Sequence, residues 1–92
     1  MKRTPKNLIY HELIGLEVQV LHHLSENYIG LSGIVIDETK NSLLILTSKG
    51  VKRILKKGGK FLFKLSDKVY VLIDGKDILA RPEERVKMIK WR

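Results

Sequence analysis

The chain has 92 residues, no cysteine and a formal net charge of +8 at pH 7. A domain of this size buries only roughly 60–65% of its unfolded surface, which leaves little room for a deep substrate cavity. The lack of cysteine excludes a disulfide framework, a thiolate nucleophile and a cysteine zinc site. No apolar run approaches the roughly 18 residues that span a bilayer, and no signal-peptide pattern opens the chain, so we expect a cytoplasmic protein.

The positive charge is concentrated in the second half of the sequence. Residues 1–48 contain four basic and five acidic residues, whereas residues 49–92 contain 14 basic and five acidic ones. A chain that carries charge for solubility alone has no reason to segregate it, so the asymmetry favours a polyanion-binding surface. Nucleic acid fits this surface better than an anionic membrane, because no long amphipathic basic helix is visible.

A short helix is predicted near the N-terminus, over residues 5–14. Thr4 can cap it, Pro5 suits the first helical position and Gly15 suits its C-terminal end. From residue 16 apolar and polar residues alternate, which predicts a half-buried strand over 16–20. The chain is thus expected to have an N-terminal tail and helix over 1–14 and a β domain over 16–80.

Five further strands are predicted, separated by short polar or glycine-containing turns. They cover residues 29–37, 43–47, 51–57, 61–65 and 69–73. Gly30 and Gly33 lie inside the first of these, where glycine usually marks a bulge, a bend or a close backbone approach. Six short strands with bend glycines favour a mainly β fold, a small and strongly bent six-stranded antiparallel barrel, over a βαβ arrangement.

A second helix is predicted over residues 82–92. Pro82 suits its first position, Glu83 and Glu84 complement the positive end of the helix dipole, and Lys87 and Lys90 complement the negative end. Its apolar residues could pack on the barrel or against a partner. The whole chain is therefore one domain, with a helix at each end.

Asp37 and Glu38 are the most conspicuous acidic neighbours in this basic protein. Adjacent strand residues point to opposite faces, so the two carboxylates cannot easily converge on one metal ion or water. Asp and Asn are also frequent where strands end and turns begin. We therefore interpret the pair as part of a hairpin corner. A metal-dependent nuclease that uses these two carboxylates is the weakest of the three hypotheses for this protein, the other two being RNA-binding proteins.

Other candidates for catalysis are weaker still. His22 and His23 face opposite sides of a strand, without a nearby partner to complete a metal set, and are interpreted as surface histidines; His11 is isolated. Residues 58–60, Gly-Gly-Lys, lack the spacing of a phosphate-binding loop. Phe61 and Phe63 share one strand face and are predicted to be core rather than base-stacking residues.

A basic surface remains as the candidate functional site. Lys49, Lys52, Arg53, Lys56, Lys57, Lys60, Arg81, Arg85, Lys87 and Lys90 are the residues predicted to contact phosphate. Such clusters bind the nucleic-acid backbone in a salt-dependent way without reading sequence. Six aromatic residues are too few to assert a stacking platform, so structured RNA recognised by backbone and shape fits best.

The order of motifs resembles a known family. The matching segments are LIGLEVQV (13–20), GLSGIVIDETKNSLLILTSKGVK (30–52), KKGGKFLFKL (56–65), IDG (73–75) and RPEERVK (81–87). Together they resemble the archaeal ribonuclease P protein component 1 family, the counterpart of the twenty-nine-kilodalton subunit of the eukaryotic enzyme. Ser42 stands where that family often has threonine.

The resemblance implies an Sm-like barrel with flanking helices and a role in the ribonucleoprotein that removes the 5′ leader from precursor tRNA. It implies that the RNA subunit carries the catalysis with magnesium, that the protein holds no cofactor or metal, and that its partners are the ribonuclease P RNA, a zinc-ribbon subunit (ribonuclease P protein component 4) and precursor tRNA. A general Sm-like or ribosomal RNA-binding module outside ribonuclease P is the alternative.

Overall fold

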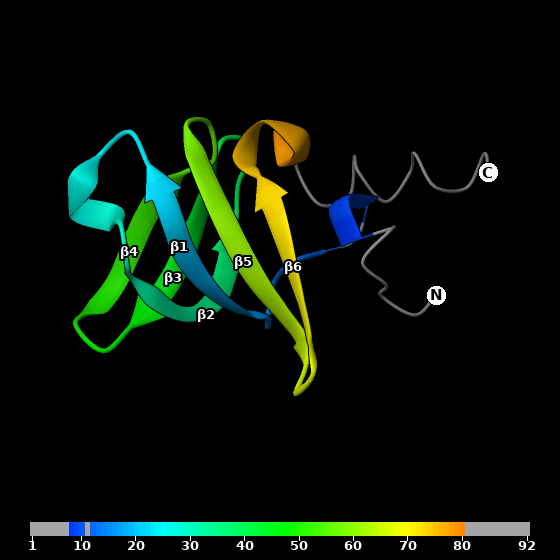
Figure 1. Ribbon diagram of the computed structural model, residues 1–92. Coiled ribbons are helices and arrows are strands. Elements are labelled where there is room, and N and C mark those ends of the chain that lie inside the picture. The colour runs from blue at the N-terminus through cyan, green and yellow to red at the C-terminus, as the bar shows by residue number, and fades with distance from the viewer. Residues whose placement is uncertain (1–7, 11, 81–92) are drawn as a thin grey trace.

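The computed structural model describes residues 8–10 and 12–80, which form one curved β-sheet (Figure 1). Its six antiparallel strands are β1 (Glu17–His23), β2 (Ser32–Glu38), β3 (Ser42–Thr47), β4 (Gly50–Leu55), β5 (Gly59–Ser66) and β6 (Val69–Asp74). Short 3-10 helices, η1 (Leu8–Tyr10), η2 (Glu26–Tyr28) and η3 (Gly75–Ile78), flank them. The order across the sheet is β4-β3-β2-β1-β5-β6, so β4 and β6 are its edges.

Six antiparallel strands were predicted and are confirmed, but the predicted closed barrel is wrong. The edge strands β4 and β6 are not hydrogen-bonded to each other, so the sheet stays open. It still curves enough to bury one core, since residues of β1, β3, β4 and β5 share one buried cluster. Figure 1 shows β1 and β5 passing in front of β3. Phe61 and Phe63 from β5 are fully buried, as predicted, in the same cluster as Ile45 and Ile54 from β3 and β4.

Two β-bulges decide which side chains of β1 and β2 face this core. The strand registers shift between Val20 and His22 and between Val35 and Asp37, which leaves Leu21 and Ile36 as extra, exposed residues. An inserted residue reverses the inside–outside alternation beyond it. Each bulge therefore turns the last residue of its strand inward.

Only the first of the two predicted helices can be compared with the structure, and only in part. Within residues 8–10 and 12–14 only the 3-10 turn η1 is helical, so the helix predicted over 5–14 does not reach residue 14. Leu8 and Leu13 are nevertheless fully buried, and Gly15 turns the chain into β1 with a φ of 92°. The helix predicted over 82–92 lies outside the described residues.

Close backbone packing explains two of the glycines. A Cβ on Gly33 would collide with the carbonyl of Leu46, so of the three explanations that the sequence left open for this glycine, the close backbone approach applies. A Cβ on Gly75, at the start of η3, would collide with the carbonyl of Lys56. Gly75 thus lets η3 lie directly against the chain that leaves β4.

Candidate nucleic-acid interface

Basic side chains follow the edge strand β4 and the loops at both of its ends. Lys49 lies in the turn before β4, Lys52 and Arg53 lie within it, and Lys57 lies in the turn after it. At about 3.3 Å per residue, the six residues of β4 alone span about 20 Å. We call these four residues the basic edge; they form a cationic track at one side of the sheet.

The residues of the basic edge do not all face one way. Lys52 pairs with the buried Ile45, whereas Arg53 pairs with Leu44 on the opposite face of the sheet. Arg53 is exposed and Lys52 is partly buried. A polyanion that contacts both must therefore wrap the edge of the sheet, rather than lie flat on one face.

Lys60 lies on β5, next to the turn that carries Lys57. It is exposed and pairs across the strands with His22 on one side and Asp74 on the other. The sequence prediction did not include Lys40, which is exposed in the turn between β2 and β3. Lys40 comes close to this region because Asn41, its neighbour, accepts a 2.8 Å backbone hydrogen bond from Lys56.

Lys56 is the one described member of the predicted RNA-binding set that the structure removes from the surface. Its side chain is fully buried, and its Nζ lies 2.9 Å from Oε1 of the equally buried Glu38. A phosphate could reach this ammonium only if the fold opened around it. The alternation that puts Ile54 in the core continues to Lys56, and this is the signal that could have predicted its burial.

Four of the predicted residues, Arg81, Arg85, Lys87 and Lys90, lie outside the described residues. They belong to the segment 81–92, which follows Ala80, the last residue that the structure describes. Their contact with phosphate stays a prediction.

Asp37 and Glu38 diverge, as the sequence predicted. Asp37 is exposed and its Oδ1 accepts a 2.8 Å hydrogen bond from the backbone N–H of Glu38, while the side chain of Glu38 turns inward to Lys56. Within residues 8–10 and 12–80 no three His, Cys, Asp or Glu side chains gather as metal ligands would. The carboxylate pair therefore has no geometry for metal-dependent cleavage.

The prediction that both strand-end histidines lie at the surface is right for His22 and wrong for His23. The β1 bulge turns His23 inward, where its Nε2 lies 2.9 Å from the carbonyl oxygen of Leu55. Its Nδ1 accepts a 2.9 Å hydrogen bond from the backbone N–H of Ser25. His23 thus fastens β1 to the end of the edge strand β4, and His11 lies outside the described residues.

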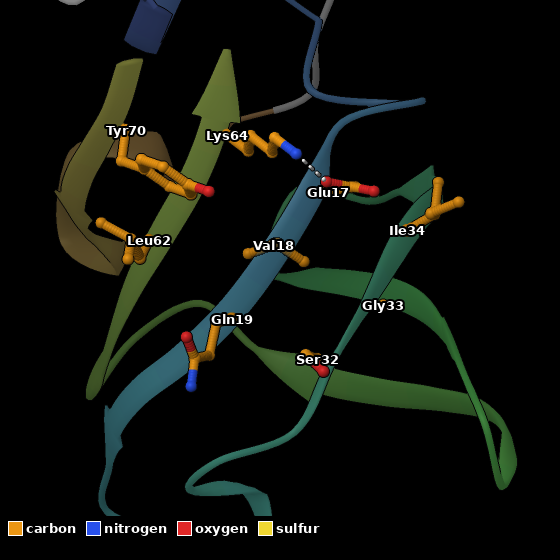
Figure 2. Close-up of a pocket in the computed structure, with 9 residues that line it drawn as sticks. All are labelled: Glu17, Val18, Gln19, Ser32, Gly33, Ile34, Leu62, Lys64 and Tyr70. Atoms are coloured by element: carbon orange, nitrogen blue, oxygen red, sulfur yellow. Dashed lines mark ion pairs between the residues drawn. The ribbon is translucent and has the colours of Figure 1, made fainter. Parts of the chain in front are cut away.

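A shallow groove of about 310 Å³ crosses the outward face of the sheet (Figure 2). Gln19, Ser32, Leu62 and Tyr70 line it beside the ion-paired Glu17 and Lys64. The Nζ of Lys64 lies 3.4 Å from Glu17 and 3.6 Å from Asp67. Its charge is therefore locally balanced, and the groove is not a second phosphate site.

The same ion pair changes the titration of Lys64. A hydrogen bond from its ammonium to Glu17, together with the charge of that carboxylate, raises the pKa of Lys64 above its ordinary value of 10.5. Tyr70 and Asp67 add smaller effects in the same direction, and partial desolvation opposes them. Lys64 thus stays protonated throughout the physiological range, as a partly exposed structural cation.

Within the described residues no helix is long and apolar enough to cross a membrane.

Comparison with known proteins identifies the family of this chain. The family model for ribonuclease P/MRP, subunit p29, matches residues 6–88. Ribonuclease P protein component 1 of Staphylothermus marinus is 47% identical over 90 residues, which cover 97% of this chain and 98% of that protein. The protein of the same name from Methanosphaera stadtmanae is 49% identical over 84 residues, or 91% of this chain and 90% of the relative.

A solved structure supports the same conclusion. The chain of Mth11, described as a homologue of the human RNase P protein Rpp29, superposes with a TM-score of 0.60 at 41% sequence identity, covering 82% of this chain and 97% of that one. The sequence resemblance and these matches agree on the family. The chain belongs to the ribonuclease P/MRP subunit p29 family, the protein component 1 of ribonuclease P.

Proposed function

We propose that this protein binds the RNA subunit of ribonuclease P through the basic edge and Lys60, and so supports RNA-catalysed removal of the 5′ leader from precursor tRNA. The observation that carries this proposal is the placement of Lys49, Arg53 and Lys57 as exposed cations along and beyond an edge strand. Such a track contacts successive phosphates and reads backbone shape rather than base sequence.

The chemistry of cleavage belongs to the RNA in this proposal. Magnesium ions held by the RNA supply the metal-assisted step, and the protein reduces the repulsion between phosphates that otherwise demands more magnesium. We also count Arg81, Arg85, Lys87 and Lys90 among the residues proposed to contact phosphate. Precursor tRNA is the substrate of the assembled particle.

We also propose the zinc-ribbon subunit, ribonuclease P protein component 4, as a protein partner. Val51, Leu46 and Ile34 are cross-strand neighbours on the outward face, and each is more than 40% exposed. An apolar row of this kind, on neighbouring strands, is typical of a surface that a protein covers. It supports a protein contact on this face, which Arg53 of the basic edge borders.

Reconstitution tests the role in cleavage. The protein and its proposed partner are added to ribonuclease P RNA, and cleavage of precursor tRNA is measured at limiting magnesium. We expect the protein to restore cleavage that the RNA alone does not achieve. RNA binding without any effect on cleavage would support a general RNA-binding module instead, and cleavage by the protein without RNA would overturn the proposal.

Charge reversal tests the surface. We expect Lys52→Glu/Arg53→Glu to weaken RNA binding and to reduce the slope of log K against log salt by about one to two, since each lost phosphate contact contributes about 0.7–0.9. Lys68→Glu/Lys76→Glu is the matched control: it changes the net charge equally at exposed residues outside the basic edge. An equal slope in both variants would move the RNA-binding surface elsewhere.

A further inference from the structure

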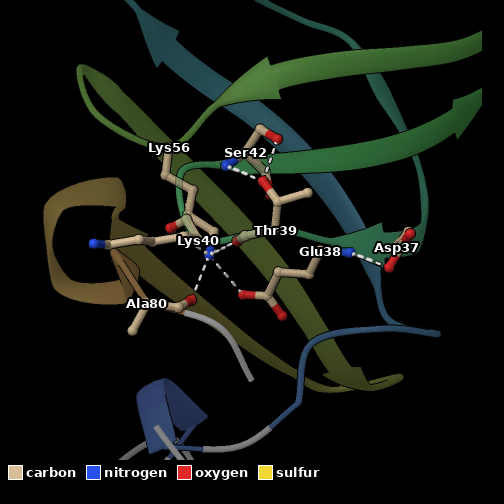
Figure 3. Close-up of polar contacts among 7 residues, drawn as sticks. All are labelled: Asp37, Glu38, Thr39, Lys40, Ser42, Lys56 and Ala80. Carbon is tan, nitrogen blue, oxygen red and sulfur yellow. Dashed lines mark hydrogen bonds and ion pairs between the residues drawn. The ribbon is translucent and has the colours of Figure 1, made fainter. Parts of the chain in front are cut away.

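Lys56 is the centre of a buried polar cluster in which segments far apart in the sequence meet (Figure 3). Its Nζ lies 2.7 Å from the carbonyl oxygen of Thr39, 2.9 Å from that of Ala80 and 3.3 Å from that of Lys40. Oε1 of Glu38 lies 2.9 Å away. We call Lys56 and the groups around it the lysine hub.

The ammonium of Lys56 donates hydrogen bonds to several oxygen atoms at once. An ammonium has three N–H groups, and at least four oxygen atoms lie within reach here, so at least two of them share a donor. The long contact to Lys40 fits such sharing. Charge-assisted bonds of this kind are stronger than neutral ones, so the ammonium fixes three separate carbonyl groups at once.

The backbone of Lys56 strengthens the same connection. Its N–H donates a 2.8 Å hydrogen bond to Asn41, and its carbonyl accepts one of 3.2 Å from Gly59. The missing Cβ of Gly75 lets η3 lie against that carbonyl. Main chain and side chain of one residue thus join the turn after β2, the turn after β4 and the chain at Ala80.

These are also the places from which basic side chains project. Lys40 is exposed on the first turn, Lys57 is exposed on the second, and Lys60 is the second residue of β5, just beyond that turn. Figure 3 shows the side chain of Lys40 pointing away from the hub. The carbonyl of Ala80 is covalently followed by the basic C-terminal sequence.

We propose that Lys56 is a positioning residue for RNA binding: the lysine hub holds the turns that carry Lys40, Lys57 and Lys60 in one fixed arrangement, so that they act as a single phosphate-binding surface. This inference rests on the proposed RNA-binding function. It also assigns Lys40, from the acidic half of the sequence, to that surface.

Stability alone does not account for such a cluster. Replacing both members of a buried ion pair by apolar residues of similar volume is often neutral or even stabilising. An apolar pair would, however, supply no donor to the carbonyls of Thr39, Lys40 and Ala80. What the ammonium provides beyond stability is the relative position of the turns.

The experiment compares two variants with opposite expected profiles, using the full chain and in vitro transcribed ribonuclease P RNA. In Lys56→Met/Glu38→Leu both charges and the donor are lost together. We expect a folded protein that loses less stability than Lys56→Met alone, because no buried charge is left unpaired, but with RNA affinity reduced about three- to tenfold and a salt slope reduced by about one. In Glu38→Gln the donor to the carbonyls remains, and we expect lower stability with RNA affinity within twofold of the wild type.

A coupling measurement identifies the side chains through which Lys56 acts. In a background of Lys40→Ala/Lys57→Ala/Lys60→Ala, the hub substitution should change RNA affinity less than twofold, because the residues that it positions are already absent. An unchanged affinity of the folded Lys56→Met/Glu38→Leu protein in the wild-type background would overturn the inference.

The Glu38→Gln variant keeps the test decisive if the double variant does not fold. The RNA affinity of Glu38→Gln is measured at a temperature well below its thermal unfolding midpoint, where the protein is folded. If its RNA affinity falls in parallel with its stability, a positioning role of Lys56 is contradicted. Failure of the wild-type protein to bind the RNA in a salt-dependent way would instead contradict the proposed function. The two failures are therefore distinguishable.

Discussion

Two lysine–glutamate ion pairs in this molecule have the same chemistry and opposite surroundings. Lys56 and Glu38 are both fully buried, at an Nζ–Oε1 distance of 2.9 Å. Lys64 and Glu17 lie on the outward face of the sheet, with side chains 32% and 60% exposed and a distance of 3.4 Å. Solvent screens the second pair, whereas the side chains of the first have no surface exposed to solvent.

The difference teaches where an ion pair matters for folding. An exposed pair gains little, because water already solvates both charges and salt screens their attraction. In a buried pair the loss of one partner leaves the other charge without solvent, and the fold must open to hydrate it. We therefore expect substitutions in the two pairs to differ sharply.

The largest effect is expected for the single substitution Lys56→Met. It leaves the buried carboxylate of Glu38 without its cation and three carbonyls without their donor, so the free energy of unfolding should fall by about 3–5 kcal/mol. Urea denaturation monitored by circular dichroism measures this. A fall below about 1 kcal/mol would mean that water reaches the hub.

Gly75→Ala should have the next largest effect. The new Cβ collides with the carbonyl of Lys56, and moving that carbonyl disturbs the hub from its other side. A loss of about 1–3 kcal/mol in the free energy of unfolding is expected from such overpacking. Lys76→Ala, at the exposed neighbouring residue, is the control and should change stability little.

Glu17→Gln should shift a titration more than it shifts stability. Glu17 is the largest cause of the raised pKa of Lys64, ahead of Tyr70 and Asp67. The substitution should move the pKa of Lys64 down toward its ordinary value, and more so than Asp67→Asn does. Heteronuclear NMR of the lysine side chains measures both shifts, and a larger effect of Asp67→Asn would reverse the assignment.

The smallest effect is expected for the pH dependence that this pair adds to stability. Because the pKa of Lys64 is raised by folding, its stabilising contribution is fully present below the ordinary lysine pKa of 10.5 and is lost as pH rises through the folded value. The wild-type and Lys64→Met proteins should therefore differ slightly in stability at pH 7 and converge as pH rises through the raised pKa of Lys64. Thermal unfolding against pH measures the difference, which 1 M salt should also reduce.

Part of the fold could be predicted from local sequence. Six strands appear where apolar alternation and turn residues predict them, since a period of two and turn-forming residues act over a few neighbouring positions. Closure of the sheet could not be predicted this way. It depends on whether β4 and β6 meet after the whole sheet has curved, and they do not pair.

The candidate site divides in the same way. The segregation of positive charge, the exposed cations of β4 and the family were all readable from the sequence, because charge and motif order need no third dimension. The burial of Glu38 and of His23 was not. Each residue follows a bulge that adds one exposed residue to its strand, so the last residue of the strand faces the core. Where such a bulge forms depends on the pairing with the partner strand.

The sequence by itself thus determined the strands, the segregation of positive charge and the family of this protein. The tertiary structure decided which of its charged side chains remain exposed at the surface. Lys56 is one lysine among 14 basic residues in the second half of the chain, and only the meeting of the turns at Thr39 and Lys40 with the chain at Ala80 makes it a buried donor. Whether a charged side chain is hydrated at the surface or buried among protein groups depends on which distant segments of the chain fold around that side chain.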